Sequence, residues 1–194
     1  MYLSKRNLKS YASLLSLICA ISLITDNANA QRGLELENDT LSQTVLIHPV
    51  IETVEDQYIS TREHTYRSHL GKGDQLGRDF MVASTNRYGI IEVYKNEGRS
   101  NEDYFGWNKN VMAPMDAEVT RGNEADSTNK PGSMNSNIDP GIIAFQKDNG
   151  LTVLYVHVKN IDVEKGDRVD AGDIIAKVGN NGRSIAPHVH VGAW

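Results

Sequence analysis

Two histidines separated by a single residue stand near the C-terminal end, in the run Ala186-Pro187-His188-Val189-His190-Val191. Because side chains alternate along a strand, His188 and His190 are expected on one face, with Val189 and Val191 directed into a core. Paired imidazoles at this spacing either share one metal ion or divide into a metal ligand and an acid–base group. The triplet alone fits an ordinary strand with two exposed histidines about equally well. The elements around it must therefore decide between these interpretations.

A third histidine ends the second strand of a predicted hairpin. The segments Gly141–Lys147 and Leu151–Val158 are rich in apolar and β-branched residues, and Asp148-Asn149-Gly150 between them is a strong turn signal. Alternation along the second strand predicts that His157 lies on the same face as Tyr155. A lone strand histidine is most often a hydrogen-bonded structural residue, so His157 gains interest only in combination with the C-terminal pair.

Short strands separated by turns account for most of the chain after Ala30, where we find no convincing amphipathic helix. Turn signals recur roughly every eight to twelve residues, which is typical of an all-β fold. Thr44–Val54 is interrupted by Pro49 and so suits an edge strand or two short strands, whereas Gly71–Val82 is a glycine-rich turn leading into a strand. Further expectations are a polar stretch at 57–70, strands at 88–94 and after Pro114, an exposed loop at 121–140 and a final strand from His188.

Residues 1–30 have the features of a secretory signal. They combine a basic start, an apolar stretch too short to span a membrane comfortably and a small-residue cleavage site at Ala28-Asn29-Ala30. The predicted organisation is a signal peptide at 1–30, a polar leader at 31–43 and one domain at 44–194. Cys19, the only cysteine, is lost with the signal, which leaves an exported protein, periplasmic or extracellular, without disulfides.

The charge balance argues against nucleic acid as a partner. Removal of residues 1–30 takes away three basic residues and one acidic residue, so the net charge changes from −5 to −7. An acidic chain without a basic stripe is a poor binder of nucleic acid. No stretch after Ala30 resembles a transmembrane helix or a basic amphipathic helix, so no membrane span is expected in the mature chain.

The C-terminal motifs resemble those of the lysostaphin-like zinc endopeptidases of bacterial cell walls. The resemblance rests on Leu154-Tyr155-Val156-His157, on two Gly-Asp turns within 163–175 and on the run 179–190. Val111–Val119, with Ala117 in place of a glycine, and Gly77-Arg78-Asp79-Phe80 are similar to two further motifs of that family. The resemblance covers roughly residues 71–194. It implies antiparallel β-sheets in a sandwich or open barrel-like domain of the duplicated hybrid motif type, with a groove.

The resemblance also implies a zinc site. In the family, zinc is held by a histidine, by the aspartate four residues later and by the second histidine of the His-x-His strand. The last two correspond to Asp79 and His190 in this sequence. The family's two further active-site histidines, which act on the water and on the substrate, correspond to His157 and His188.

The sequence departs from the family pattern at the first zinc ligand. The residue four positions before Asp79 is Gln75 instead of histidine, and a neutral amide oxygen is a weak zinc ligand. Three alternatives are open. Gln75 ligates zinc weakly, another histidine such as His69 takes its place, or the site holds metal weakly or not at all.

The resemblance implies a secreted, zinc-dependent endopeptidase that hydrolyses peptide crosslinks of peptidoglycan, with peptidoglycan peptides and other cell-wall hydrolases as partners. One alternative, favoured by Gln75, is a catalytically degenerate relative that binds peptidoglycan or regulates a wall hydrolase. Another is a lipoyl- or biotinyl-like carrier, because 166–178 is similar in pattern, but Lys177 lies within an apolar strand and not at a hairpin tip. Relatives usually continue beyond the His190 strand, so the expectation is either a truncated chain or a short sheet edge.

Overall fold

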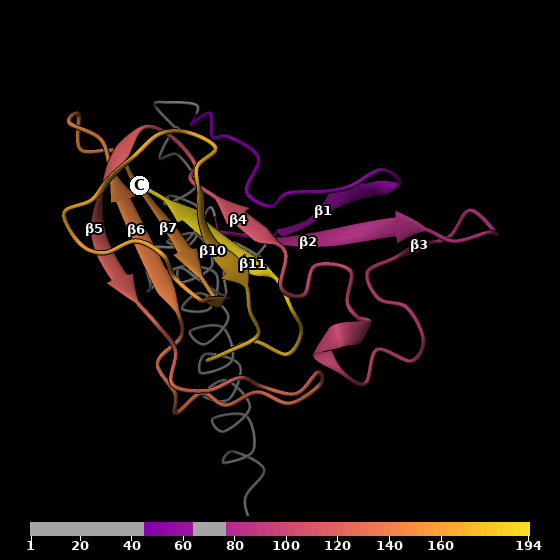
Figure 1. Cartoon of the computed structure of the whole chain (residues 1–194). Coiled ribbons are helices and arrows are strands. Elements are labelled where there is room, and N and C mark those ends of the chain that lie inside the picture. Colours follow the sequence, from indigo (N-terminus) through magenta and orange to yellow (C-terminus); the bar gives the residue numbers. More distant parts are fainter. Residues whose placement is uncertain (1–44, 64–76) are drawn as a thin grey trace, which may run out of the picture. The chain divides into compact units, whose positions relative to one another are not determined.

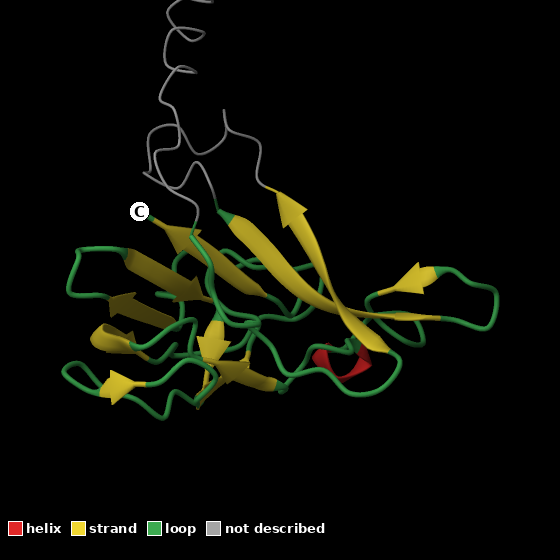
Figure 2. Ribbon diagram, turned by 90° about the horizontal axis from the view of Figure 1, so that it is seen from above, coloured by secondary structure: helices red, strands yellow, loops and turns green. Residues whose placement is uncertain are grey.

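Antiparallel strands dominate the computed structural model, which describes residues 45–63 and 77–194. The predicted secretory signal at 1–30, the leader at 31–43, His69 and Gln75 lie outside the described residues. Within the described ranges, the strands form two sheets, and helical structure is limited to the short 3-10 helix η2 (Asn101–Asp103). Figure 2 shows this predominance of strands and loops over helix. The predicted all-β fold with antiparallel sheets is confirmed as a sandwich-like arrangement without a closed barrel.

The larger, eight-stranded sheet brings the N-terminal and C-terminal strands together. Its order is β1-β2-β11-β7-β6-β5-β9, and β3 also pairs with β2. Figure 1 shows β5, β6, β7 and β11 side by side, with β1 and β2 extending from them as an arm toward β3. The strands are β1 (Gln57–Glu63), β2 (Arg78–Thr85), β3 (Ile91–Glu92), β5 (Ala117–Asn123), β6 (Ile142–Gln146), β7 (Thr152–Val156), β9 (Arg168–Val169) and β11 (Val189–Ala193).

The smaller, three-stranded sheet has the order β4-β10-β8. Its strands are β4 (Asn110–Met112), β8 (Val158–Lys159) and β10 (Ile174–Val178). Alternating residues of both sheets share one apolar core, and on β11 these are Val189 and Val191, as predicted. Burial of these β-branched side chains fixes the register of β11, because a shift by one residue would turn them away from the core. None of the helical structure in the described residues is long and apolar enough to cross a membrane.

The hairpin predicted around residues 148–150 joins β6 to β7. Gln146 pairs with Thr152, and the Lys147 amide donates to the Leu151 carbonyl at 3.0 Å. Gly150 has φ +88°, a left-handed conformation that glycine adopts without steric cost. The residues of the turn were therefore sufficient to predict this hairpin from the sequence.

Three segments near the arm differ from their sequence-based expectations. Residues 45–54 form no strand; Ile51 makes one isolated bridge to Val111, and Pro49 has no N–H to donate to a ladder. The polar stretch from Gln57 instead begins with strand β1, which pairs with β2 along its whole length. The strand predicted at 88–94 is limited to β3, whose exposed residues pair only with the end of β2.

The hydroxyl of Tyr155 gives a stability prediction. This side chain is fully buried against Phe145, and its hydroxyl has no hydrogen-bond partner among the residues that the structure describes. A buried, unsatisfied polar group costs free energy, so Tyr155→Phe should raise the free energy of unfolding by about 1 kcal/mol. Urea denaturation measures this change, with Tyr58→Phe on β1 as a control expected to be near neutral. A loss of stability in Tyr155→Phe would contradict the prediction.

Candidate metal centre

The candidate metal centre begins with a cross-strand pair. β11 pairs with β2 so that His190 lies opposite Asp79, and side chains at opposed positions of an antiparallel pair are neighbours. The Nδ1 atom of His190 lies 2.9 Å from Oδ1 of Asp79. These residues are 111 positions apart in sequence, so the sheet order, with β11 between β2 and β7, is what brings them together.

His188 approaches the same carboxylate oxygen from the turn that precedes β11. Its Nε2 atom lies 3.4 Å from Oδ1 of Asp79, and its Nδ1 atom lies 2.7 Å from the carbonyl oxygen of Ala186. Because a carbonyl only accepts hydrogen bonds, Nδ1 of His188 carries a proton and donates it to Ala186. Nε2 of His188 therefore faces the Asp79 carboxylate, while Nδ1 is held by the backbone.

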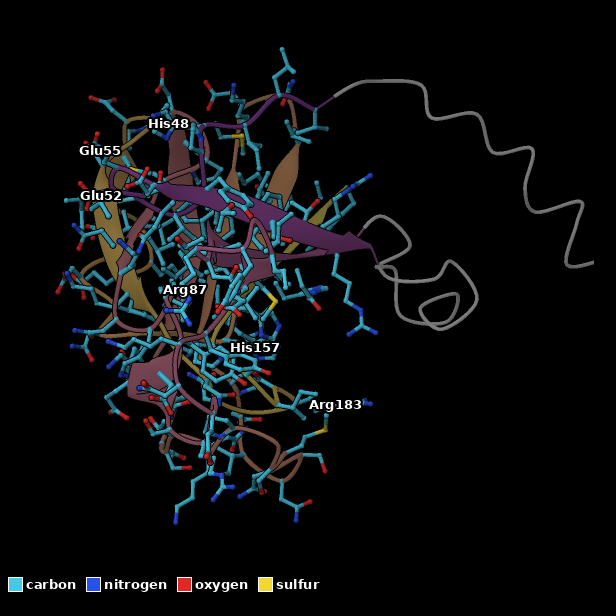
Figure 3. The ribbon with its side chains drawn as sticks, turned by 90° about the vertical axis from the view of Figure 1, so that its right-hand side faces the viewer. His48, Glu52, Glu55, Arg87, His157 and Arg183 are labelled. Atoms are coloured by element: carbon cyan, nitrogen blue, oxygen red, sulfur yellow. The ribbon has the colours of Figure 1, made fainter. Side chains whose placement is uncertain are left out.

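His157 joins the cluster by a route that strand alternation does not predict. β7 ends at Val156, and His157 has φ +70°, a left-handed backbone conformation that is rare for residues other than glycine. The expectation that it shares the face of Tyr155 is wrong, since this bend turns the imidazole toward His188 and His190. The ring centroids lie 4.7 Å and 6.3 Å away, respectively. Figure 3 shows His157 among the side chains of the body, with Arg183 projecting outward.

The environment of His157 keeps its imidazole neutral. Nδ1 lies 2.8 Å from the carbonyl oxygen of Asn181, so it carries the proton and leaves Nε2 as an acceptor. Burial lowers the pKa of His157 to about 3, assisted by the nearby charge of His188, although the hydrogen bond to Asn181 acts in the opposite direction. At neutral pH this side chain therefore accepts a hydrogen bond at Nε2.

Asp79 and His190 have a spacing close to that of two ligands of one zinc ion. Two ligand atoms of a tetrahedral zinc ion lie about 3.3 Å apart, close to the 2.9 Å that separates Nδ1 of His190 from Oδ1 of Asp79. This pair therefore fits two positions of one ion. Within residues 45–63 and 77–194, however, no group of three or more His, Cys, Asp or Glu side chains is arranged to hold a metal. The two candidates for a third ligand, Gln75 and His69, both lie outside the described residues.

Two loop aromatics and Lys177 have contacts of their own within the fold. Trp107 lies under the ammonium of Lys159, and Tyr104 packs against Tyr94. Lys177 lies in β10 and donates to Asn110, which agrees with its strand position and not with a carrier tip.

Sequence reasoning missed the polar residues that support the histidines. Asn129, within the loop predicted to be exposed, is 7% exposed, and its amide donates to the carbonyls of Gly182 and Ser184. Asn180 and Asn181 are also buried, although asparagine in a Gly-Asn-Asn-Gly run indicates only a turn. Their supporting role is visible only in the three-dimensional structure, because their hydrogen-bond partners come from other loops.

Residues 103–194 match the model of Peptidase family M23. Over these residues the chain is similar to Peptidase family M23. The match confirms the resemblance to the lysostaphin-like endopeptidases, and the M23 family is zinc-dependent. The matched residues include His157, His188 and His190, whereas Asp79 precedes them. The place of Asp79 in the site therefore rests on its distances to the two C-terminal histidines.

Solved structures similar to the chain include M23 proteins. Pseudoalterin, an M23 metalloprotease from the deep sea, has a TM-score of 0.47 and 17% identity, over 78% of this chain and 72% of its own. A chain of the SpoIIIAH–SpoIIQ complex has a TM-score of 0.44 and 16% identity, over 76% of this chain and 91% of its own. A zinc-containing peptidase from Vibrio cholerae has a TM-score of 0.35 and 15% identity, over 60% and 46%.

Proposed function

We propose that the protein is an exported, zinc-dependent endopeptidase that hydrolyses peptide crosslinks of bacterial peptidoglycan. The observation that carries this proposal is the convergence of one carboxylate and three imidazoles, from Asp79, His157, His188 and His190. Each of the three histidine residues is 8% exposed. Burial of several titratable groups together is costly, so such clusters are found mainly where they bind metal or act in catalysis. The predicted signal at residues 1–30 supports export to the compartment where peptidoglycan lies.

Asp79 and His190 are the proposed zinc ligands among the described residues. Zinc, when bound, supplies Lewis acidity that activates water and polarises a peptide carbonyl. Asp79 contributes a hard, charged oxygen and His190 an imidazole nitrogen, the donor types that zinc prefers. The third position is proposed for Gln75 or for His69.

The remaining two histidines have surroundings that suit different tasks. His157, neutral and unprotonated at Nε2, accepts a hydrogen bond from the attacking water and so orients it toward the carbonyl. His188, whose Nε2 atom lies beside Asp79, is the group proposed to pass a proton to the leaving amine. Backbone carbonyls hold both rings through Nδ1, so neither imidazole has to reorganise during the reaction.

A peptidoglycan-clearing assay tests this proposal. The full chain, with zinc added, should clear purified peptidoglycan, and a chelator should abolish clearing because the Lewis acid is removed. His188→Ala should reduce the clearing rate by about 100-fold or more, the usual contribution of a general acid or base. His48→Ala, a matched control outside the cluster, should clear at the wild-type rate. Equal rates for the two variants would contradict the assigned role of His188.

A degenerate relative that binds peptidoglycan or regulates a wall hydrolase is the second candidate. It is favoured by Gln75 at the first ligand position and by the lack of a three-ligand group within the described residues. This candidate predicts protein that purifies without zinc and clears nothing, yet co-sediments with insoluble peptidoglycan. Metal analysis after purification and a sedimentation assay therefore separate the two candidates.

A further inference from the structure

Asn181 lies at the centre of the backbone bend that places His157. It belongs to the turn between β10 and β11 and is 1% exposed. Its Oδ1 atom accepts a hydrogen bond from the Gly141 amide at 3.0 Å. Its Nδ2 atom donates to the carbonyl of Val158 at 2.9 Å and, more weakly, to that of His157 at 3.4 Å. One buried side chain therefore joins the bend to two other segments.

The bend needs such support because it is unfavourable in itself. A residue other than glycine in the left-handed region costs of order 1–3 kcal/mol, and His157 has φ +70°. If the chain relaxed to extended backbone, strand alternation would turn the imidazole to the side of Tyr155. The hydrogen bonds of the Asn181 amide to the carbonyls of His157 and Val158 oppose this relaxation.

Two glycines provide the space in which the Asn181 amide meets the carbonyls of His157 and Val158. A Cβ atom on Gly141 would collide with the carbonyl oxygen of Val158, and one on Gly179 would collide with the carbonyl oxygen of His157. Both Cβ atoms would also lie close to Nδ2 of Asn181. The carbonyls of Val158 and His157, which accept hydrogen bonds from the Asn181 amide, therefore each pack against a glycine. The absence of a side chain at that glycine permits the close approach of the backbone.

We propose that Asn181 is a positioning residue that sets both the direction and the tautomer of His157. Its side-chain amide holds the left-handed bend, and its backbone carbonyl accepts the Nδ1 proton, so that Nε2 is the atom presented to the cluster. The catalytic consequence rests on the proposed hydrolase function, whereas the position and tautomer of His157 do not.

Asn181→Asp tests the proposal in the full chain, because aspartate keeps the acceptor for Gly141 and removes the two amide donors. Long-range 15N NMR of histidine-labelled protein, without metal or substrate, reports the tautomer of each imidazole. The wild-type protein should show His157 protonated at Nδ1 only, and the variant should show a mixture with the Nε2 tautomer. In hydrolysis assays kcat should fall by about 100-fold, the effect of a misplacement near 1 Å, with little change in KM.

Asn129→Asp is the matched control, because it removes two donors to carbonyls of the same turn without touching the His157 bend. It should lower the melting temperature, as Asn181→Asp does, yet leave the His157 tautomer unchanged. If Asn181→Asp does not fold, Asn181→Ser is measured in the same way, with the same expectation.

The outcomes separate this proposal from the proposed function. A folded Asn181 variant whose His157 keeps the Nδ1 tautomer and whose kcat is that of the wild type overturns the positioning role. A tautomer change in a protein whose wild type hydrolyses nothing supports the positioning role and rejects the hydrolase.

Discussion

Asp79→Asn should lower the affinity for zinc by at least about 100-fold and abolish measurable hydrolysis of peptidoglycan crosslinks. Loss of a group that merely orients a ligand already costs about 10–100-fold in metal affinity, and Asp79 is proposed as a ligand itself. The substitution removes the negative charge that Nδ1 of His190 approaches at 2.9 Å and Nε2 of His188 at 3.4 Å. Competition with a chromophoric chelator measures the zinc affinity directly.

Asp116→Asn is the control for this result. Its carboxylate accepts a hydrogen bond from the Ala171 amide at 2.8 Å, outside the histidine cluster, so zinc affinity and hydrolysis should be unchanged. Wild-type zinc affinity in folded Asp79→Asn would contradict the assignment of Asp79 as a ligand. The same affinity loss in both variants would show that the effect is not local.

Gln75→His should have the opposite effect and strengthen zinc binding by about 10–100-fold, the range over which ligand-shell changes act. An imidazole nitrogen replaces a weak amide oxygen at the position where the M23 resemblance places a histidine. If the third ligand limits activity, hydrolysis at low zinc concentration should rise in parallel. The chelator competition assay gives the affinity, and the rate is measured at a fixed, subsaturating zinc concentration.

His69→Ala distinguishes the alternatives for the third ligand. If His69 substitutes for the missing histidine, His69→Ala should release zinc from the wild-type chain but not from Gln75→His. If Gln75 itself ligates, His69→Ala should have no effect on either. Unchanged zinc affinity in Gln75→His would count against the register that pairs position 75 with Asp79.

Local signals predicted the central part of the fold. The Asp148-Asn149-Gly150 turn and the alternation in β11 are read from neighbouring residues, and the structure has β7 and β11 where these signals place them. The arm was harder to predict. β1 is a polar edge strand that gains its order by pairing with β2, and residues 45–54 run beside β4 as irregular backbone. Both outcomes depend on tertiary pairing, which overrides local propensity.

The candidate site was predicted in residue type but not in geometry. His188 and His190 both approach Asp79, as a shared face predicts, although His188 precedes the strand. For His157 alternation gave the wrong face, because a single left-handed residue reverses the direction of the side chain. The family resemblance identified His157 without that geometric reason. Asn181 had no sequence signal beyond its turn, since its partners, Gly141 and Val158, lie far away in the chain.

The most direct test of the central claim, that Asp79, His157, His188 and His190 form a hydrolytic metal site, is mass spectrometry of peptidoglycan after incubation with the zinc-loaded protein. A hydrolytic metal site should produce fragments with new amino and carboxyl termini at the peptide crosslinks, and these should be absent when a chelator is added and absent for Asp79→Asn. Folded, zinc-loaded protein that leaves every crosslink intact would contradict the claim.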